Sequence, residues 1–125
     1  MAILHRFFWI GSLFLATLIT GIWLGLAGRA LHPALSGFHK LLALAWVAFA
    51  AIRFYHLAGQ MRLSEVLIGA IAVLGLCMIT LIASGSVLTL PSLASANWVV
   101  VHSIASAIAV AAFGITLRLL ALTNP

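Results

Sequence analysis

Apolar residues fill four long stretches of the chain, and short segments rich in Gly, Pro, Ser and charge separate them. The stretches cover residues 7–27, 38–57, 65–88 and 98–120. Each has about the twenty residues that an α-helix needs to cross the hydrocarbon core of a bilayer. The segments between them carry the residue types that favour loops and turns. The pattern predicts an all-α fold, an integral membrane four-helix bundle that forms a single transmembrane domain over residues 1–125.

The composition changes this picture little and removes two alternatives. Hydrophobic residues make up 66% of the chain and charged residues 6%, which excludes an ordinary soluble domain. The net charge of +5 comes from basic residues that stand singly at segment ends, unlike the basic face of a nucleic-acid-binding protein.

The lone cysteine, Cys77, forms no internal disulfide, and its mid-segment position indicates a small buried apolar residue. Ser64 is expected to cap the third helix, with Glu65 in its first turn.

Basic residues also predict an orientation. Four spans place both termini on one side, and that side holds more of the charge: Arg6, Arg53, Arg62 and Arg118, against Arg29 and Lys40 on the other. Cytoplasmic loops carry the excess of Lys and Arg. Both termini are therefore expected in the cytoplasm.

The two halves of the chain resemble each other. His39 and His102 are 63 residues apart, and Gly21 and Gly85 are 64 residues apart. Each half has a helix, a small-residue step with a glycine, a loop, and a histidine near the head of the next helix. Parallel repeats of this kind are related by an axis along the membrane normal. The repeat predicts that His39 and His102 lie at one depth and face each other across the bundle.

Ionisable side chains at membrane depth usually face the interior and mark a functional site. A metal ion held by two imidazoles needs its other positions filled, and haem fills four of them. Zinc would need further ligands, and only His32 in the outer loop could join. Small residues along the His102 face and larger ones along the His39 face suggest walls for a flat cofactor: Ala105, Ser106, Ala109, Ala112 and Thr116, against Leu42, Trp46, Phe49 and Arg53. The alternatives are close helix packing for the small residues and hydrogen-bonded interfacial positions for the two histidines.

Other polar residues have two interpretations each. His5 and His56 would hold a second haem on the inner side, or lie as interfacial side chains. Lys40 and Arg29 would pair with haem propionates, or serve as topology charges. Arg53 would neutralise a cofactor carboxylate or a quinone, or extend to the interface. Glu65 would accept a proton at a quinone site, or simply complement its helix dipole.

Four short motifs resemble the bacterial cytochrome b-561 family of membrane proteins. They are His5-Arg6-Phe7-Phe8-Trp9 with Leu18-Ile19-Thr20-Gly21, then Phe38-His39-Lys40-Leu41-Leu42-Ala43-Leu44, Ile82-Ala83-Ser84-Gly85, and Val101-His102-Ser103. The resemblance spans nearly the whole chain. It implies a four-helix protein of the bacterial inner membrane that moves electrons through b-type haem, with quinol or a redox protein as partner.

The resemblance assigns the family's outer haem to His39 and His102. The inner haem of the family resembles a pair formed by His5 and a histidine late in the fourth helix. Residues 114–117 hold no histidine here, which implies one haem, or two if His56 takes that place.

Several functions stay open at this point. The chain would act as an electron-transfer protein, alone, as a homo-oligomer, or as a subunit of an oxidoreductase complex. A small transporter is a second hypothesis, although such exporters need a carboxylate deep in a span and Glu65 lies at a helix end. A cofactor-free membrane subunit is a third, against which the repeated histidine stands.

Overall fold

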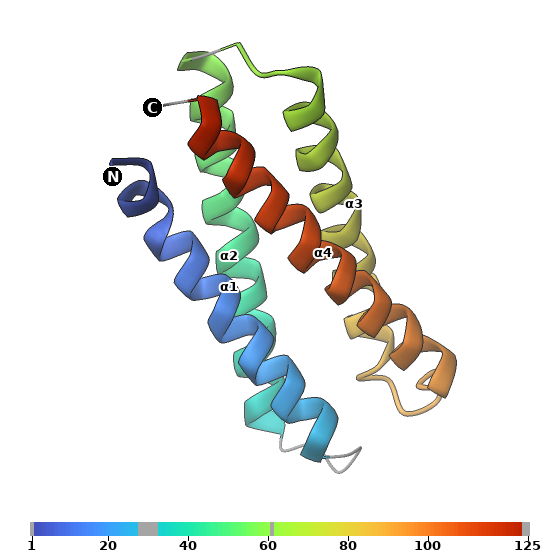
Figure 1. Ribbon diagram of the computed structural model, residues 1–125. Helices are drawn as coiled ribbons and strands as arrows, with labels where there is room; N and C mark the ends of the chain where they lie inside the picture. Colours follow the sequence, from blue (N-terminus) through green and yellow to red (C-terminus); the bar gives the residue numbers. More distant parts are fainter. Residues whose placement is uncertain (1, 28–32, 61, 124–125) are drawn as a thin grey trace. The chain divides into compact units, whose positions relative to one another are not determined.

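The computed structural model describes residues 2–27, 33–60 and 62–123, without the side chains of residues 2–6 and 123. The described chain forms α1 (Ala2–Ala27), α2 (Pro33–Gln60), α3 (Glu65–Val87) and α4 (Ala96–Thr123). No strand occurs in these residues, so the all-α prediction is confirmed. The helices divide between two compact units, residues 1–62 and 63–125. Each unit is a hairpin of two antiparallel helices, α1 beside α2 and α3 beside α4 (Figure 1).

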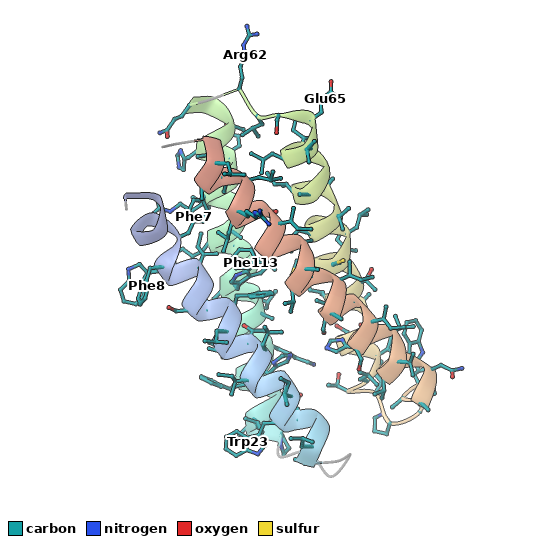
Figure 2. The ribbon with its side chains drawn as sticks, viewed as in Figure 1. Phe7, Phe8, Trp23, Arg62, Glu65 and Phe113 are labelled. Atoms are coloured by element: carbon teal, nitrogen blue, oxygen red, sulfur yellow. The ribbon has the colours of Figure 1, made fainter. Side chains whose placement is uncertain are left out.

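Each helix is long and apolar enough to cross a membrane. The shortest, α3, has 23 residues, and at about 1.5 Å per residue it exceeds the roughly 30 Å hydrocarbon core. Large apolar side chains cover the outward faces, among them Phe8 and Trp23, which project from α1 and are 58% and 61% exposed (Figure 2). Water would penalise such a surface, whereas lipid solvates it. The described chain is that of a multi-pass membrane protein.

The helix boundaries correct the expected loops. Residues 33–37 were expected in a loop because Pro33, Ser36 and Gly37 are breakers, but α2 begins at Pro33. Proline suits the first turn of a helix, where its missing N–H has no partner and its φ is already helical. Residues 58–60 and 96–97 were also expected in loops and are helical. His39 and His102 are each the seventh residue of their helix, about two turns from its start.

Aromatic side chains join the helices of the first hairpin. Trp46 of α2 is 2% exposed, and its ring centroid lies 5.0 Å from that of Phe14 in α1. Closer to the start of α1, the ring centroids of Phe7 and Phe54 are 6.3 Å apart. These contacts account for part of the aromatic wall expected beside a cofactor. Trp46 packs within its own hairpin, and Phe49 and Arg53 are exposed.

Small residues pack the second hairpin together with larger apolar ones. The buried residues of α3 are Leu67, Leu74, Cys77 and Ser84, and the small buried residues of α4 are Ala105, Ala109, Ala112 and Thr116. Steps of three, four and seven residues along both helices are the heptad spacing of left-handed helix pairs. Small side chains let membrane helices approach closely. The small stripe of α4 therefore serves helix packing against α3, the alternative left open above, and the buried position expected for Cys77 is confirmed.

Local signals fix the ends of the second hairpin. The Ser64 side chain caps α3 as expected, accepting a hydrogen bond from the Leu67 N–H at 3.3 Å. Glu65 follows in the first turn of α3, exposed at the end of the helix (Figure 2). Beyond α3, the N–H groups of Leu90 and Ala94 donate to the Val87 and Leu90 carbonyls at 3.0 and 2.9 Å, closing turns around Pro91. These turns return the chain so that α4 lies along α3.

Candidate functional site

His39 lies against the first helix of its hairpin. Its Nδ1 is 3.0 Å from the Thr20 Oγ1, and its ring is half-buried. A Cβ built on Gly21 would lie 3.0 Å from the His39 Cε1 and 3.6 and 3.7 Å from the two ring nitrogens. The ring therefore occupies the space that a side chain at position 21 would take. Glycine is needed here for close approach of the imidazole to the backbone of α1.

His102 lies in the same way against α3. Its Nδ1 is 2.9 Å from the Ser84 Oγ, and Ser84 is completely buried. A Cβ on Gly85 would lie 3.3 Å from the His102 Cε1 and 3.8 Å from its Nδ1. The second hairpin therefore repeats the first, with a slightly wider gap beside the glycine.

The repeated unit is a triad of hydroxyl, glycine and histidine. Thr20-Gly21 and Ser84-Gly85 each place a hydroxyl directly before the glycine on the first helix of a hairpin. Each histidine is the seventh residue of the second helix. We call these two sets the histidine triads: Thr20, Gly21 and His39 in the first hairpin, and Ser84, Gly85 and His102 in the second. The repeat predicted from residue spacing thus extends to matching contacts.

Both hydroxyls also bond to their own helix. Thr20 Oγ1 donates toward the Ala16 carbonyl at 2.9 Å, with the Thr17 carbonyl at 3.0 Å. Ser84 Oγ donates toward the Thr80 carbonyl at 2.6 Å, with the Leu81 carbonyl at 3.3 Å. Hydroxyls commonly bond in this way to carbonyls one turn back in a helix. Such bonds hold each oxygen in place beside the ring.

The remaining candidate residues take less specific positions. Lys40 is half-buried next to His39, whereas Arg53 and His56 are exposed on α2. The His56 ring lies edge-on to Tyr55, with their centroids 6.0 Å apart. Arg29 and His32 lie outside the described residues. His5 belongs to α1 but its side chain is not described, and the antiparallel hairpin places it at the same end as His56.

Sequence reasoning found the histidines and the glycines but missed the hydroxyls. Thr20 and Ser84 were noted only as part of a small-residue step and within the motifs that carry the family resemblance. The available signal was a hydroxyl residue directly before the repeated glycine, 19 and 18 residues before the histidine. That separation is the length of a hairpin turn plus the helical segments on either side of it.

The donor set has a definite chemical character. Among the described residues, no three His, Cys, Asp or Glu side chains gather where they could hold a metal ion. Each triad instead offers one imidazole whose Nδ1 is engaged by a hydroxyl. A single imidazole from each of two places suits a metal whose other ligands come with a macrocycle. Comparison of the chain with protein-family models, with curated proteins and with solved structures gave no match.

Proposed function

We propose that the protein is a membrane b-type cytochrome that transfers electrons through haem, with His39 and His102 as the two axial ligands. The observation that carries the proposal is the pair of histidine triads, one in each hairpin. Placing a half-buried histidine in an apolar membrane helix costs free energy. Two such histidines, each beside a hydroxyl and a glycine, are harder to attribute to packing alone. The resemblance to the bacterial cytochrome b-561 family supports the same proposal.

The residues present fit a haem. Metal-bound histidine typically gives its second ring nitrogen to an oxygen acceptor, and Thr20 and Ser84 stand at that nitrogen. Glycine beside each ring leaves room for imidazole against the neighbouring helix. When bound, haem supplies the one-electron redox change. Lys40, Arg29 and Arg53 are the basic residues proposed to hold its propionates or a quinone.

The setting of the proposal is the bacterial inner membrane, with both termini in the cytoplasm and quinol or a redox protein exchanging electrons with the haem. His5 and His56, at one end of the first hairpin, are the candidate ligands of a second haem. The chain would act alone, as a homo-oligomer or as a subunit of a larger complex, depending on the molecule with which it exchanges electrons. A cofactor-free subunit remains the competing function, in which each triad would only hydrogen-bond the two helices of its hairpin.

The visible spectrum of the purified protein tests the proposal. We expect a Soret band and the sharp reduced bands of low-spin haem with two imidazole ligands after addition of dithionite. His39→Ala and His102→Ala should each abolish this spectrum, because either change removes an axial ligand. Tyr55→Ala is the matched control, since it removes an exposed ring from the same helix as His39.

Each outcome of this test has a clear meaning. A colourless protein, purified folded from cells supplied with haem, contradicts the proposal. So does a low-spin spectrum that persists unchanged in either ligand variant. A count of haem per chain that falls from two to one in His56→Ala would assign the second haem to that residue.

A further inference from the structure

The hydroxyl of each histidine triad has one proton and three neighbours that could take it, namely two carbonyls of its own helix and the imidazole Nδ1. Thr20 Oγ1 lies 2.9 Å from the Ala16 carbonyl and 3.0 Å from the His39 Nδ1. Ser84 Oγ lies 2.6 Å from the Thr80 carbonyl and 2.9 Å from the His102 Nδ1. A carbonyl oxygen only accepts, whereas a neutral imidazole nitrogen either donates or accepts. All bonds are satisfied together when the hydroxyl donates to the carbonyl and accepts from Nδ1–H.

The opposite arrangement leaves a bond unmade. If Nδ1 carried a lone pair, it would compete with the carbonyl for the single hydroxyl proton. One short contact would then join two acceptors, which is costly where water does not reach. The Thr80 carbonyl contact is the shortest of these, and Ser84 is completely buried, so the cost is greatest in the second hairpin.

We propose that Thr20 and Ser84 are positioning residues that hold His39 and His102 as the Nδ1–H tautomer, so that Nε2 carries the lone pair used for metal binding. This inference rests on the proposed function for the identity of the metal group, but the tautomer itself does not depend on haem. The triads then set ring rotation and proton position before any ligand arrives. An accepting oxygen at Nδ1–H also makes the imidazole a stronger donor at Nε2.

The tautomer is measured by nitrogen NMR on the full chain labelled with ¹⁵N-histidine and purified from cells that make no haem. The chain has five histidines, and His39→Gln and His102→Gln assign the two signals. We expect Nδ1 to be protonated and Nε2 unprotonated in both rings. Thr20→Val and Ser84→Ala should each shift only the ring of their own triad toward a mixture of tautomers. An Nε2–H tautomer in either wild-type ring overturns the inference.

Haem retention supplies the second readout. Loss of a hydrogen-bond partner behind a ligand typically lowers metal affinity by about 10–100-fold. We expect Thr20→Val and Ser84→Ala to release haem to apomyoglobin faster by about that factor and to raise the midpoint potential, because a weaker donor stabilises ferric iron less. Thr20→Ser keeps the hydroxyl and should restore both quantities.

Two hydroxyls of the same helices serve as matched controls. Ser12 is exposed on α1, and Ser86 Oγ of α3 donates to the Ile82 carbonyl at 2.7 Å. Ser12→Ala and Ser86→Ala should leave haem release and potential unchanged. Unchanged haem release in Thr20→Val and Ser84→Ala overturns the inference while leaving the cytochrome intact. Absence of haem from the wild type refutes the proposed function, and the NMR result still decides the tautomer.

Discussion

At the scale of single residues, the two glycines decide how close each imidazole comes to its neighbouring helix. A glycine inside a helix costs about 1 kcal/mol relative to alanine. At Gly75 this cost has no compensating contact, because a Cβ there would meet nothing within 4 Å. At Gly21 and Gly85 the imidazole ring fills the space instead. The glycines of the triads are thus best explained by the rings beside them.

Replacing each of these glycines by alanine should separate the effect of helix propensity on stability from the effect of ring position on haem retention. In Gly21→Ala the new Cβ would lie 3.0 Å from the His39 Cε1, and in Gly85→Ala 3.3 Å from the His102 Cε1. The ring must therefore move by a few tenths of an ångström, more in the first hairpin. We expect both variants to weaken haem retention, Gly21→Ala the more strongly. The thermal midpoint in detergent should change little, since the gain of about 1 kcal/mol in propensity offsets part of the crowding.

Gly75→Ala is the control for these two variants, because it adds the same methyl group to an exposed helical position. It should keep full haem retention and raise the thermal midpoint slightly. Equal haem retention in Gly21→Ala and Gly75→Ala would show that the ring is not held where the contact places it.

The histidines were predicted from the sequence, whereas their hydroxyl partners were missed. A histidine in an apolar stretch is rare and conspicuous. Ser and Thr are common in membrane helices, where they bond to their own backbone, as Ser103 and Ser106 do here. Thr20 and Ser84 differ from such residues in preceding the repeated glycine, but the contact with the ring is seen only in the three-dimensional register of each hairpin.

At the scale of helices, the two hairpins solve the same packing problem with different side chains. The second uses small residues that repeat every three or four positions along α4, and the first uses aromatic pairs such as Phe14 and Trp46. Heptad spacing was already visible in the sequence, but it suits a cofactor wall as well as a helix partner. Because α4 lies against α3, the small residues of α4 are assigned to helix packing. The start of α2 at Pro33 was missed because proline marks both loops and first turns.

Overpacking the α4 seam should disturb its triad. Ala109 is 1% exposed, so Ala109→Leu forces α3 and α4 apart at a cost of about 1–3 kcal/mol. We expect a lower thermal midpoint in detergent and loss of haem, because Ser84 and His102 lie on the separated helices. Ala107→Leu adds the same side chain to an exposed position of α4 and should behave like the wild type. Equal midpoints for the two leucine variants would contradict this packing.

Tryptophan offers a matched comparison in the first hairpin. Trp46 is 2% exposed and Trp23 is 61% exposed. Trp46→Ala opens a cavity beside Phe14, and since lipid replaces water as the alternative surroundings, its cost should fall below the about 3–5 kcal/mol seen in soluble cores. We expect a cost of roughly 2 kcal/mol in detergent unfolding, and almost none for Trp23→Ala. An equal loss in both variants would mean that Trp46 is not a packing residue.

At the scale of the whole molecule, each hairpin brings its own histidine, hydroxyl and glycine together within one repeat. Binding of one iron by both His39 and His102 would join the repeats, and it stays a prediction from the internal symmetry. Spacing along the chain predicts two equal units, but it contains no information on how two lipid-facing helix pairs associate. A shared cofactor would supply the contact that apolar faces in lipid otherwise lack.

The uneven basic charge predicts how the molecule lies in the membrane, and cysteine labelling tests it. The native Cys77 is buried in α3, so it should react little with a membrane-impermeant maleimide applied to whole cells. Gln60→Cys places a thiol at the exposed end of α2 beside Arg62, and Ser92→Cys places one in the exposed segment between α3 and α4. With Arg53, Arg62 and Arg118 facing the cytoplasm, Ser92→Cys should be labelled in intact cells and Gln60→Cys only after lysis. The reverse order would place the termini outside, and labelling of both sites in intact cells would contradict four membrane crossings.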